Sequence, residues 1–271
     1  MRGVLALFEG VATGAADGYA RMADRPAAVL LHLGCGLGNG LANLHNARKG
    51  HTPVVNIVGD HATYHKQYDA QLESDIETVA RNVSTWIRTS ASVEEVAADA
   101  ADAVAVASGP PAQIATLILP ADVSWTEGAT PASKVAPAAP TAPDPAAVAA
   151  IAAVLQGDEP AALFVGGRAC RADALVDASR VANATGAKLL AETFPARIER
   201  GAGRVPVERL AYLAEFAAMQ LDGLKHLVLV DSKSPVSFFA YPGKASDLVP
   251  EGCTVHVLAG RSGDPAAALA A

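Results

Sequence analysis

The chain is poor in aromatic residues and in cysteine, and both shortages limit what it can be. Aromatic residues make up 5% of the 271 residues, while 51% are hydrophobic, so the core must consist mostly of alanine, valine and leucine. The three cysteines, Cys35, Cys170 and Cys253, lie far apart. Their number and spacing fit neither a disulfide framework nor a metal site. Such cysteine usage favours a reducing, cytoplasmic setting.

Long apolar runs and clusters of positive charge are also missing. No apolar run reaches the roughly 20 residues that a membrane-spanning helix needs. The N-terminus has one arginine and a short apolar run that Glu9 ends, which is not the pattern of a signal peptide. The formal net charge is −7, and no basic cluster offsets it. These features argue against a membrane, a nucleic acid or another polyanion as a partner.

The chain instead contains short apolar runs that alternate with helix-like stretches, on both sides of a proline-rich segment. Residues 126–145 hold five prolines among alanine, threonine and serine, which predicts a semi-rigid linker. A chain of 271 residues is long enough for two domains. Strands that alternate with helices indicate parallel sheets. We therefore predict an α/β protein with two doubly wound, mainly parallel-sheet domains, residues 1–125 and 146–271.

The positions of these elements follow from the lengths of the runs and from their periodicity. The predicted strands are Gly3–Phe8, Ala27–Leu33, Pro53–Val58, Gln113–Leu119, Ala161–Val165, Lys188–Ala191, His226–Val230 and Thr254–Leu258. Beyond a first helix after Glu9, the predicted helices are Leu41–Arg48, Val93–Ala107, Ala146–Leu155, Asp173–Thr185 and Val207–Gln220. The glycines at positions 34, 36 and 38 predict a tight turn before the second helix.

The stretch Leu7–Arg21 carries the clearest chemical signal. Glu9 stands where the first predicted strand ends and a helix begins. Ligands of open α/β sheets bind at the carboxyl ends of strands, and negative charge is stabilised at a helix N-terminus. On these local features alone, a simple helix-start residue is the better interpretation of Glu9.

A wider pattern changes that interpretation. Several stretches, each aligned without gaps and all in the same order along the chain, resemble thiamine diphosphate enzymes of the acetolactate synthase type. These stretches are Glu9 with Asp-Gly-Tyr-Ala-Arg at 17–21, Gly-Cys-Gly-Leu-Gly-Asn at 34–39, Pro-Val-Val-Asn-Ile-Val-Gly at 53–59, and Asp-Ala-Gln-Leu-Glu-Ser-Asp-Ile at 69–76. The resemblance is strong over residues 1–125 and weak beyond. It implies that 1–125 is the pyrimidine-binding domain without its first strand and helix, and that 146–271 is the central domain.

The resemblance also implies a reaction: decarboxylation and carboligation of 2-oxo acids with thiamine diphosphate, as in branched-chain amino acid biosynthesis. In the family, a carboxylate at the position of Glu9 bonds the aminopyrimidine ring and favours its imino form, whose nitrogen then accepts the thiazolium proton. Glu9 is thus the implied catalytic and cofactor-binding residue. A homodimer or homotetramer is implied as well, with the face 34–48 buried between subunits and its small residues Gly38, Gly40, Ala42 and Ala47 packed closely.

Three further residues are implied to contact the cofactor, namely His32, Cys35 and Asn39. Asn39 matches the family residue, whereas His32 replaces a threonine and Cys35 a proline. Asn39 also suits a helix N-cap, and both roles are compatible. Cys35 is better interpreted as a small turn residue than as a nucleophile, since no general base is implied beside it.

Gln71 and Leu72 occupy the positions where acetolactate synthases have phenylalanine and glutamine near the substrate. This departure, together with His61 and His65 in a polar loop, supports an alternative: a thiamine diphosphate-dependent decarboxylase of aromatic or sulfonated 2-oxo acids. For each histidine, a solvated loop residue is the simpler interpretation.

The family binds the cofactor diphosphate through Mg²⁺ in a third domain that carries Gly-Asp-Gly, and this motif does not occur in the 271 residues. We therefore expect a fragment of an enzyme, inactive and weakly cofactor-binding by itself, with no metal ligands of its own. The remaining alternative is a non-catalytic binding or assembly module. Some members hold FAD in the central domain. Here Gly166-Gly167-Arg168 lacks a full dinucleotide fingerprint, so a plain strand-to-helix turn is preferred and no residue requires a flavin.

Overall fold

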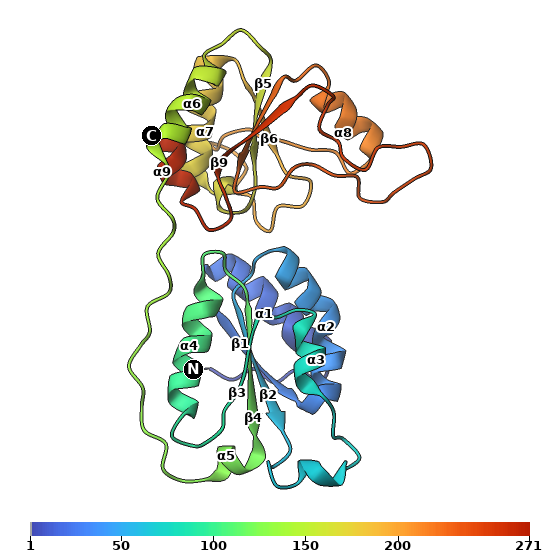
Figure 1. Cartoon of the computed structure of the whole chain (residues 1–271), viewed down its shortest axis with the longest axis vertical. Helices are drawn as coiled ribbons and strands as arrows, with labels where there is room; N and C mark the ends of the chain where they lie inside the picture. Colours follow the sequence, from blue (N-terminus) through green and yellow to red (C-terminus); the bar gives the residue numbers. More distant parts are fainter. Residues whose placement is uncertain (1) are drawn as a thin grey trace. The chain divides into compact units, whose positions relative to one another are not determined.

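The computed structural model describes residues 2–271, which form two compact units, residues 2–139 and 140–271 (Figure 1). The division falls inside the predicted linker. Residues 126–139 are exposed and contain no helix or strand, as expected for a proline-rich segment. Within the described part of the chain, no helix has the length and apolar character that crossing a membrane requires.

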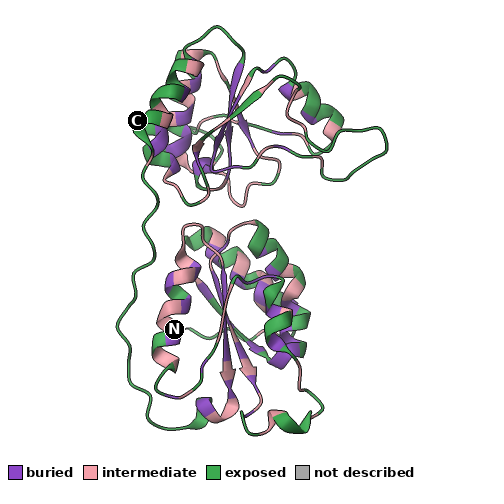
Figure 2. Ribbon diagram, in the orientation of Figure 1, coloured by how far each residue is buried: buried purple, intermediate pink, exposed green. Residues whose placement is uncertain are grey.

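The first unit is a parallel sheet of strand order β1-β2-β4-β3 with helices on both faces. Helices α1, α2 and α3 cover one face, and α4 covers the other. Its elements are α1 (Glu9–Ala23), β1 (Ala27–His32), α2 (Leu33–Lys49), β2 (Val54–Asp60), η1 (Lys66–Tyr68), α3 (Ile76–Arg81), β3 (Trp86–Thr89), α4 (Val96–Ser108), β4 (Ile114–Pro120) and α5 (Ala121–Trp125). The central strands β2 and β4 are buried on both faces (Figure 2), which explains their continuous apolar sequences.

The strand predicted at Gly3–Phe8 is wrong. These residues form no strand, and the side chains of Val4, Leu5 and Leu7 are 83%, 90% and 97% exposed. A strand needs a neighbour that pairs with its backbone N–H and C=O groups, and among the described residues the sheet ends at β1. The prediction failed because an apolar run shows only that the side chains are apolar; it does not show that a partner strand is present.

The glycine turn predicted before the second helix is also wrong. Helix α2 begins at Leu33 rather than at Leu41, so the glycines lie within its first two turns. Glycine inside a helix costs roughly 1 kcal/mol relative to alanine, which is why the pattern suggested a turn. Gly34 and Gly36 are nevertheless buried where a side chain would meet close neighbours, so tertiary packing outweighs the unfavourable propensity.

The second unit is a parallel sheet of order β7-β6-β5-β8-β9, again covered on both faces. Its elements are α6 (Pro145–Leu155), β5 (Ala161–Val165), η2 (Gly167–Cys170), α7 (Ala172–Thr185), β6 (Lys188–Ala191), β7 (Glu208–Arg209), α8 (Ala214–Leu221), β8 (His226–Val230), β9 (Thr254–Ala259) and α9 (Pro265–Ala270). The prediction of two doubly wound parallel sheets is confirmed. The helix predicted at Val207–Gln220 is wrong in its first half, which holds β7 and a loop, because a two-residue strand is too short to show a period.

Candidate active site

Glu9 and Asn39 meet at the helix starts beside the carboxyl end of β1. The Asn39 side-chain amide donates a hydrogen bond from Nδ2 to Glu9 Oε2 at 3.1 Å. Glu9 lies in the first turn of α1, where negative charge is stabilised, and Asn39 lies in the second turn of α2. Asn39 is therefore not the N-cap of that helix, a position that His32 occupies. The other carboxylate oxygen, Oε1, accepts no protein hydrogen bond among the described residues.

Close packing of α1 against α2 holds this pair in place. Thr13 Oγ1 donates to the Gly40 carbonyl oxygen at 3.1 Å, and Asn43 Nδ2 donates to the Gly10 carbonyl oxygen at 2.7 Å. A Cβ atom on Gly40 would stand 2.8 Å from the Thr13 methyl carbon, so only glycine allows the two helices to approach this closely. The spacing of the helices therefore sets the Glu9–Asn39 contact.

His32 and Cys35 lie at the same end of the sheet. His32 is the exposed last residue of β1, and the Cys35 thiol donates to its carbonyl oxygen at 3.4 Å. A Cβ placed on Gly36 would lie 3.4 Å from Glu9 Oε1 and 3.5 Å from His32 Cβ. Gly36 therefore lies between these two side chains, and its missing side chain leaves a methyl-sized space beside Oε1. The structure thus gathers Glu9 and the three predicted contact residues around one glycine.

The junction between β1 and α2 has an unusual backbone conformation that the sequence did not reveal. Leu33 has a φ of 56°, in the left-handed region that residues with a branched side chain rarely enter. Its side chain is buried in the unit, and this burial accounts for the conformation. Such conformations occur preferentially at functional sites, and this one turns the chain directly from β1 into the helix that carries Asn39.

The loop between β2 and α3 reaches this end of the sheet through Ser74, a residue whose position the sequence did not predict. Lys66 anchors the loop, with its Nζ 2.6 Å from Asp60 Oδ2 and 2.8 Å from Glu73 Oε1. Burial opposes the charge on Lys66, but the hydrogen bonds from its ammonium group to these carboxylates outweigh that effect and raise its pKa. A Cβ on Gly34 would collide with Ser74 Oγ, so the loop packs tightly on the start of α2.

Gln71 and Leu72, the predicted substrate residues, lie in an exposed turn of that loop. Neither side chain makes a hydrogen bond or ion pair to any described residue. The histidines of the loop are less solvated than predicted. The His61 and His65 rings lie 5.4 Å apart between centroids, and His61 Nε2 is shielded from solvent without a described partner.

Replacing Gly34 by alanine is expected to destabilise the first unit by about 1–3 kcal/mol, the usual cost of inserting atoms into a packed region. The reason is the collision between the new methyl group and Ser74 Oγ. Removing that side chain as well, in the Gly34→Ala/Ser74→Gly double variant, should restore part of the loss. Urea unfolding followed by circular dichroism measures both changes. Equal destabilisation in the single and the double variant would show that the loop does not rest on α2.

The second unit has its own candidate ligand position, where the carboxyl ends of β5 and β8 meet at the reversal of strand order. The chain's own carboxylates occupy the backbone donors there. Glu192 Oε1 accepts from the Gly167 N–H at 3.0 Å, and Asp231 Oδ2 accepts from the Arg168 N–H at 2.6 Å. Arg261 bridges the two acids, with Nη2 3.1 Å from Glu192 Oε2 and Nη1 3.4 Å from Asp231 Oδ1.

These residues do not fit a flavin nucleotide. The nucleotide phosphates would require N–H groups such as those of the turn, but Glu192 and Asp231 already use them and would repel an anion. A Cβ on Gly167 would collide with Asp231 and Arg261, so the space beside the turn is filled. We therefore derive no flavin chemistry for this unit, and the plain strand-to-helix turn remains the better interpretation of residues 166–168.

Comparison with known proteins places these features in a family. Residues 1–81 match the family described as thiamine pyrophosphate enzyme, N-terminal TPP binding domain. Over 272 residues the chain is 62% identical to the Mycobacterium tuberculosis protein named "Putative acetolactate synthase large subunit IlvX", an alignment that covers 100% of this chain and 52% of that protein. The chain belongs to the thiamine pyrophosphate enzymes. The resemblance seen in the sequence is therefore confirmed.

Other thiamine pyrophosphate enzymes show similarity in sequence and in structure. Benzoylformate decarboxylase of Pseudomonas aeruginosa is 33% identical over 129 residues, which are 47% of this chain and 24% of that protein. A Mycobacterium smegmatis structure, described as "a putative thiamin diphosphate-dependent enzyme", superposes with a TM-score of 0.84 at 25% identity, covering 98% of this chain and 54% of the other. Benzoylformate decarboxylase from Polynucleobacter necessarius gives a TM-score of 0.78 at 25% identity, covering 98% and 52%. The chain spans about half the length of the relative that matches it throughout.

Proposed function

We propose that this chain supplies the aminopyrimidine-binding part of a thiamine diphosphate-dependent enzyme that acts on 2-oxo acids, with Glu9 as its acid–base residue. The observation that carries the proposal is the Glu9–Asn39 pair, in which one carboxylate oxygen is bonded and the other faces the space left by Gly36. In this proposal the first unit is the pyrimidine-binding domain and the second is the central domain.

Each residue of the site has a distinct part in the proposal. Thiamine diphosphate, when bound, supplies a thiazolium carbon that becomes nucleophilic once its proton has left. Asn39 fixes Glu9 Oε2 and so leaves Oε1 to hold or release a proton at the pyrimidine ring nitrogen. We propose that the pyrimidine ring approaches that oxygen on the side of Gly36, which has no side chain, and that His32 and Cys35 lie beside the ring.

No cluster that could bind the Mg²⁺ of the cofactor occurs in the described part of the chain. Residues 2–271 hold no group of three or more histidine, cysteine, aspartate or glutamate side chains that could bind a metal ion. We therefore derive no step through the metal, and the proposal concerns the pyrimidine end of the cofactor alone.

Two substrate classes are candidates. Acetolactate-type carboligation of 2-oxo acids is supported by the name of the relative that is 62% identical over the full length of this chain. Decarboxylation of an aryl 2-oxo acid is supported by the benzoylformate decarboxylase that is 33% identical over nearly half of the chain. The second candidate also agrees with Gln71 and Leu72, which replace the phenylalanine and glutamine of acetolactate synthases.

We further propose that α2 contributes to a homodimer interface. Fewer of its small residues can take part than the sequence predicted. Gly38 and Ala42 are exposed on α2 and remain available to a partner. Gly40 and Ala47 are buried within the first unit itself, so the expected role of these two residues between subunits is wrong. The small size of Gly40 serves the contact between α1 and α2, and Ala47 packs in the core of the unit.

A chimaeric enzyme tests the proposed function. Residues 1–271 replace the aligned stretch of the Mycobacterium tuberculosis relative, and CO₂ release is measured with thiamine diphosphate and Mg²⁺. We expect cofactor-dependent release from a 2-oxo acid. Release from pyruvate with formation of acetolactate selects the first substrate class, and release from benzoylformate selects the second. A folded chimaera that binds no thiamine diphosphate, or releases no CO₂ from either acid, would contradict the proposal.

A further inference from the structure

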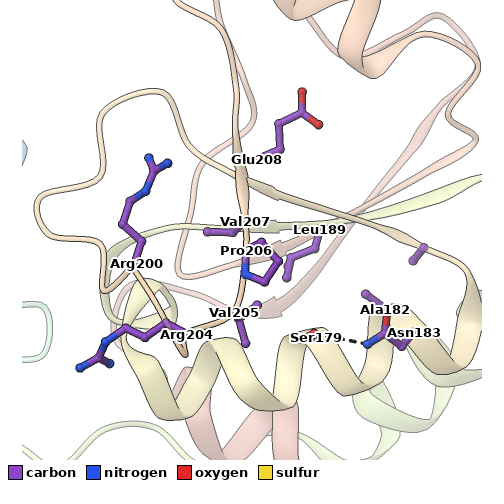
Figure 3. Close-up of a pocket in the computed structure, with 12 residues that line it drawn as sticks. Ser179, Ala182, Asn183, Leu189, Arg200, Arg204, Val205, Pro206, Val207 and Glu208 are labelled. Atoms are coloured by element: carbon purple, nitrogen blue, oxygen red, sulfur yellow. Dashed lines mark hydrogen bonds between the residues drawn. The ribbon is translucent and has the colours of Figure 1, made fainter.

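A hollow of about 840 Å³ opens in the second unit between α7 and the segment 200–208 that leads into β7 (Figure 3). This volume lies within the roughly 300–1,000 Å³ that is typical of small-molecule sites. All of its lining residues belong to the second unit, and none is part of the site around Glu9. Nothing in the proposed chemistry uses this hollow.

One part of the lining of the hollow is apolar. Ala182 is buried in the core of the unit, and Leu189, Val205 and Val207 are partly buried and packed against that core. Figure 3 places Pro206 and the two valines together on one segment that faces α7. A ligand that covered these side chains would therefore remove apolar surface from water, which favours binding by roughly 25 cal/mol per Å².

Positive charge is in excess at one side of the hollow. Glu199 is the shared partner of three arginines, with Arg171 Nη1 at 3.9 Å, Arg197 Nη2 at 2.6 Å and Arg204 Nη1 at 3.3 Å from its carboxylate oxygens. Arg200 lines the hollow and makes no hydrogen bond or ion pair to any described residue. On this side of the hollow, the two lining arginines, Arg200 and Arg204, therefore have one carboxylate between them, that of Glu199.

The acidic residue of the lining, Glu208, lies away from the two lining arginines (Figure 3). Glu208 accepts a hydrogen bond from the Gln220 side chain of α8. A hydrogen bond from the Ala172 N–H and the neighbouring arginines lower the pKa of Glu199, which favours the charged form of this residue. Glu199 can therefore compensate the charge of Arg204, its partner, but not that of Arg200 as well.

A glycine turn presents the two lining arginines together. Arg200 and Arg204 flank Gly201 and Gly203, whose φ angles are 134° and 76°, a region that other residues rarely adopt. Figure 3 shows both arginines on the same side of the hollow, opposite Asn183. The Arg204 side chain is 47% exposed, so its guanidinium can reach a ligand. Guanidinium groups match the geometry of carboxylates and phosphates, which they bind through two parallel hydrogen bonds.

We propose that this hollow binds a small organic anion, whose apolar body packs on Leu189 and Val207 and whose carboxylate or phosphate pairs with Arg200 and Arg204. The combination of an apolar floor with a cationic side is what recognises such a molecule. A neutral molecule of similar shape would lack the charge that pairs with the arginines, and inorganic phosphate would lack the apolar body that packs on Leu189 and Val207. Both should bind more weakly than the complete ligand.

Isothermal titration calorimetry on the full chain tests this proposal with four probes: benzoate, phenyl phosphate, benzyl alcohol and inorganic phosphate. We expect benzoate or phenyl phosphate to bind at least tenfold more tightly than the last two, which corresponds to about 1.4 kcal/mol. Whichever of the two aromatic anions binds more tightly identifies the preferred charged group. No measurable binding of either aromatic anion, or equal binding of benzyl alcohol, would overturn the proposal.

Arginine variants tie the binding to this hollow. Arg200→Ala removes a side chain without a described internal partner, so the unfolding midpoint should stay unchanged while the affinity for the aromatic anion falls at least tenfold. Arg200→Glu should lower the affinity further. Arg180→Ala is the matched control, because this arginine on α7 is 79% exposed and does not line the hollow. Unchanged affinity in both Arg200 variants, or an equal loss in the control, would overturn the proposal.

Discussion

Replacing Glu9 by glutamine is expected to slow the exchange of the thiazolium proton of bound thiamine diphosphate by roughly 10²–10⁴-fold, the usual contribution of a positioned acid–base group. This loss corresponds to about 3–5 kcal/mol of barrier. Glutamine keeps the size of the side chain and an oxygen that can accept the hydrogen bond from Asn39 Nδ2. What disappears is the group that can exchange a proton at the pyrimidine ring, so the fold and the Asn39 contact should survive.

Hydrogen–deuterium exchange of the cofactor, measured by NMR after acid quench in the chimaera described above, gives this rate without knowledge of the substrate. Glu77→Gln is the matched control, since Glu77 lies in the first turn of α3 and its side chain is 52% exposed. The control should exchange like the unsubstituted chimaera. If the Glu9 variant binds the cofactor and exchanges at the unsubstituted rate, Glu9 is only a helix-start residue.

Replacing Asp231 by asparagine is expected to stabilise the second unit at neutral pH by up to about 3 kcal/mol. Burial raises the pKa of Asp231 from 3.8 to about 6, although the hydrogen bond from the Arg168 N–H and the charge of Arg261 act in the opposite direction. At 1.36 kcal/mol per pKa unit, this difference makes the ionised carboxylate costly in the folded state. Asparagine resembles the protonated acid and still offers an oxygen to the Arg168 N–H.

The pH dependence follows from the same difference. The folded state holds the Asp231 proton more tightly than the unfolded chain does, so the contribution of this group to stability is complete below about pH 3.8 and is lost as the pH rises through about 6. Urea unfolding at pH 5 and pH 7 should therefore show a smaller change in the variant than in the unsubstituted chain. Asp158→Asn, at an exposed position, is the control. An Asp231 variant that is less stable at pH 7 would mean that the bridge to Arg261 outweighs the cost of burial.

Several elements could be predicted from the sequence because their signals are local. Strands β5, β6 and β8 match their predicted residues, since each is a short apolar run between turn residues or helices. The predicted strand Gly3–Phe8 and the start of α2 were wrong for a different reason, which is that both depend on tertiary neighbours. A strand requires a pairing partner, and Gly34 lies in the helix at a point where a side chain would collide with Ser74 Oγ.

The candidate site could be predicted only in part. The resemblance pointed to Glu9 and Asn39 without showing that they touch, and their hydrogen bond depends on how closely Gly40 lets α1 approach α2. The roles of Gly36 and Ser74 were not predicted, because a glycine that keeps space open and a serine that limits it carry no chemical signal in a sequence. Similarly, the carboxylates that occupy the turn at Gly167 come from strand ends 25 and 63 residues away in sequence from their backbone partners.

A crystal structure of the chimaera with thiamine diphosphate and Mg²⁺ would test the central claim, that Glu9 binds the aminopyrimidine ring, most directly. The measurement is the distance from the pyrimidine ring nitrogen to the nearer carboxylate oxygen of Glu9. The account predicts about 2.6–3.2 Å, the range of a hydrogen bond, with Asn39 still bonded to the other oxygen. A bound cofactor whose pyrimidine ring lies elsewhere, with Glu9 in contact with protein or solvent alone, would contradict the account.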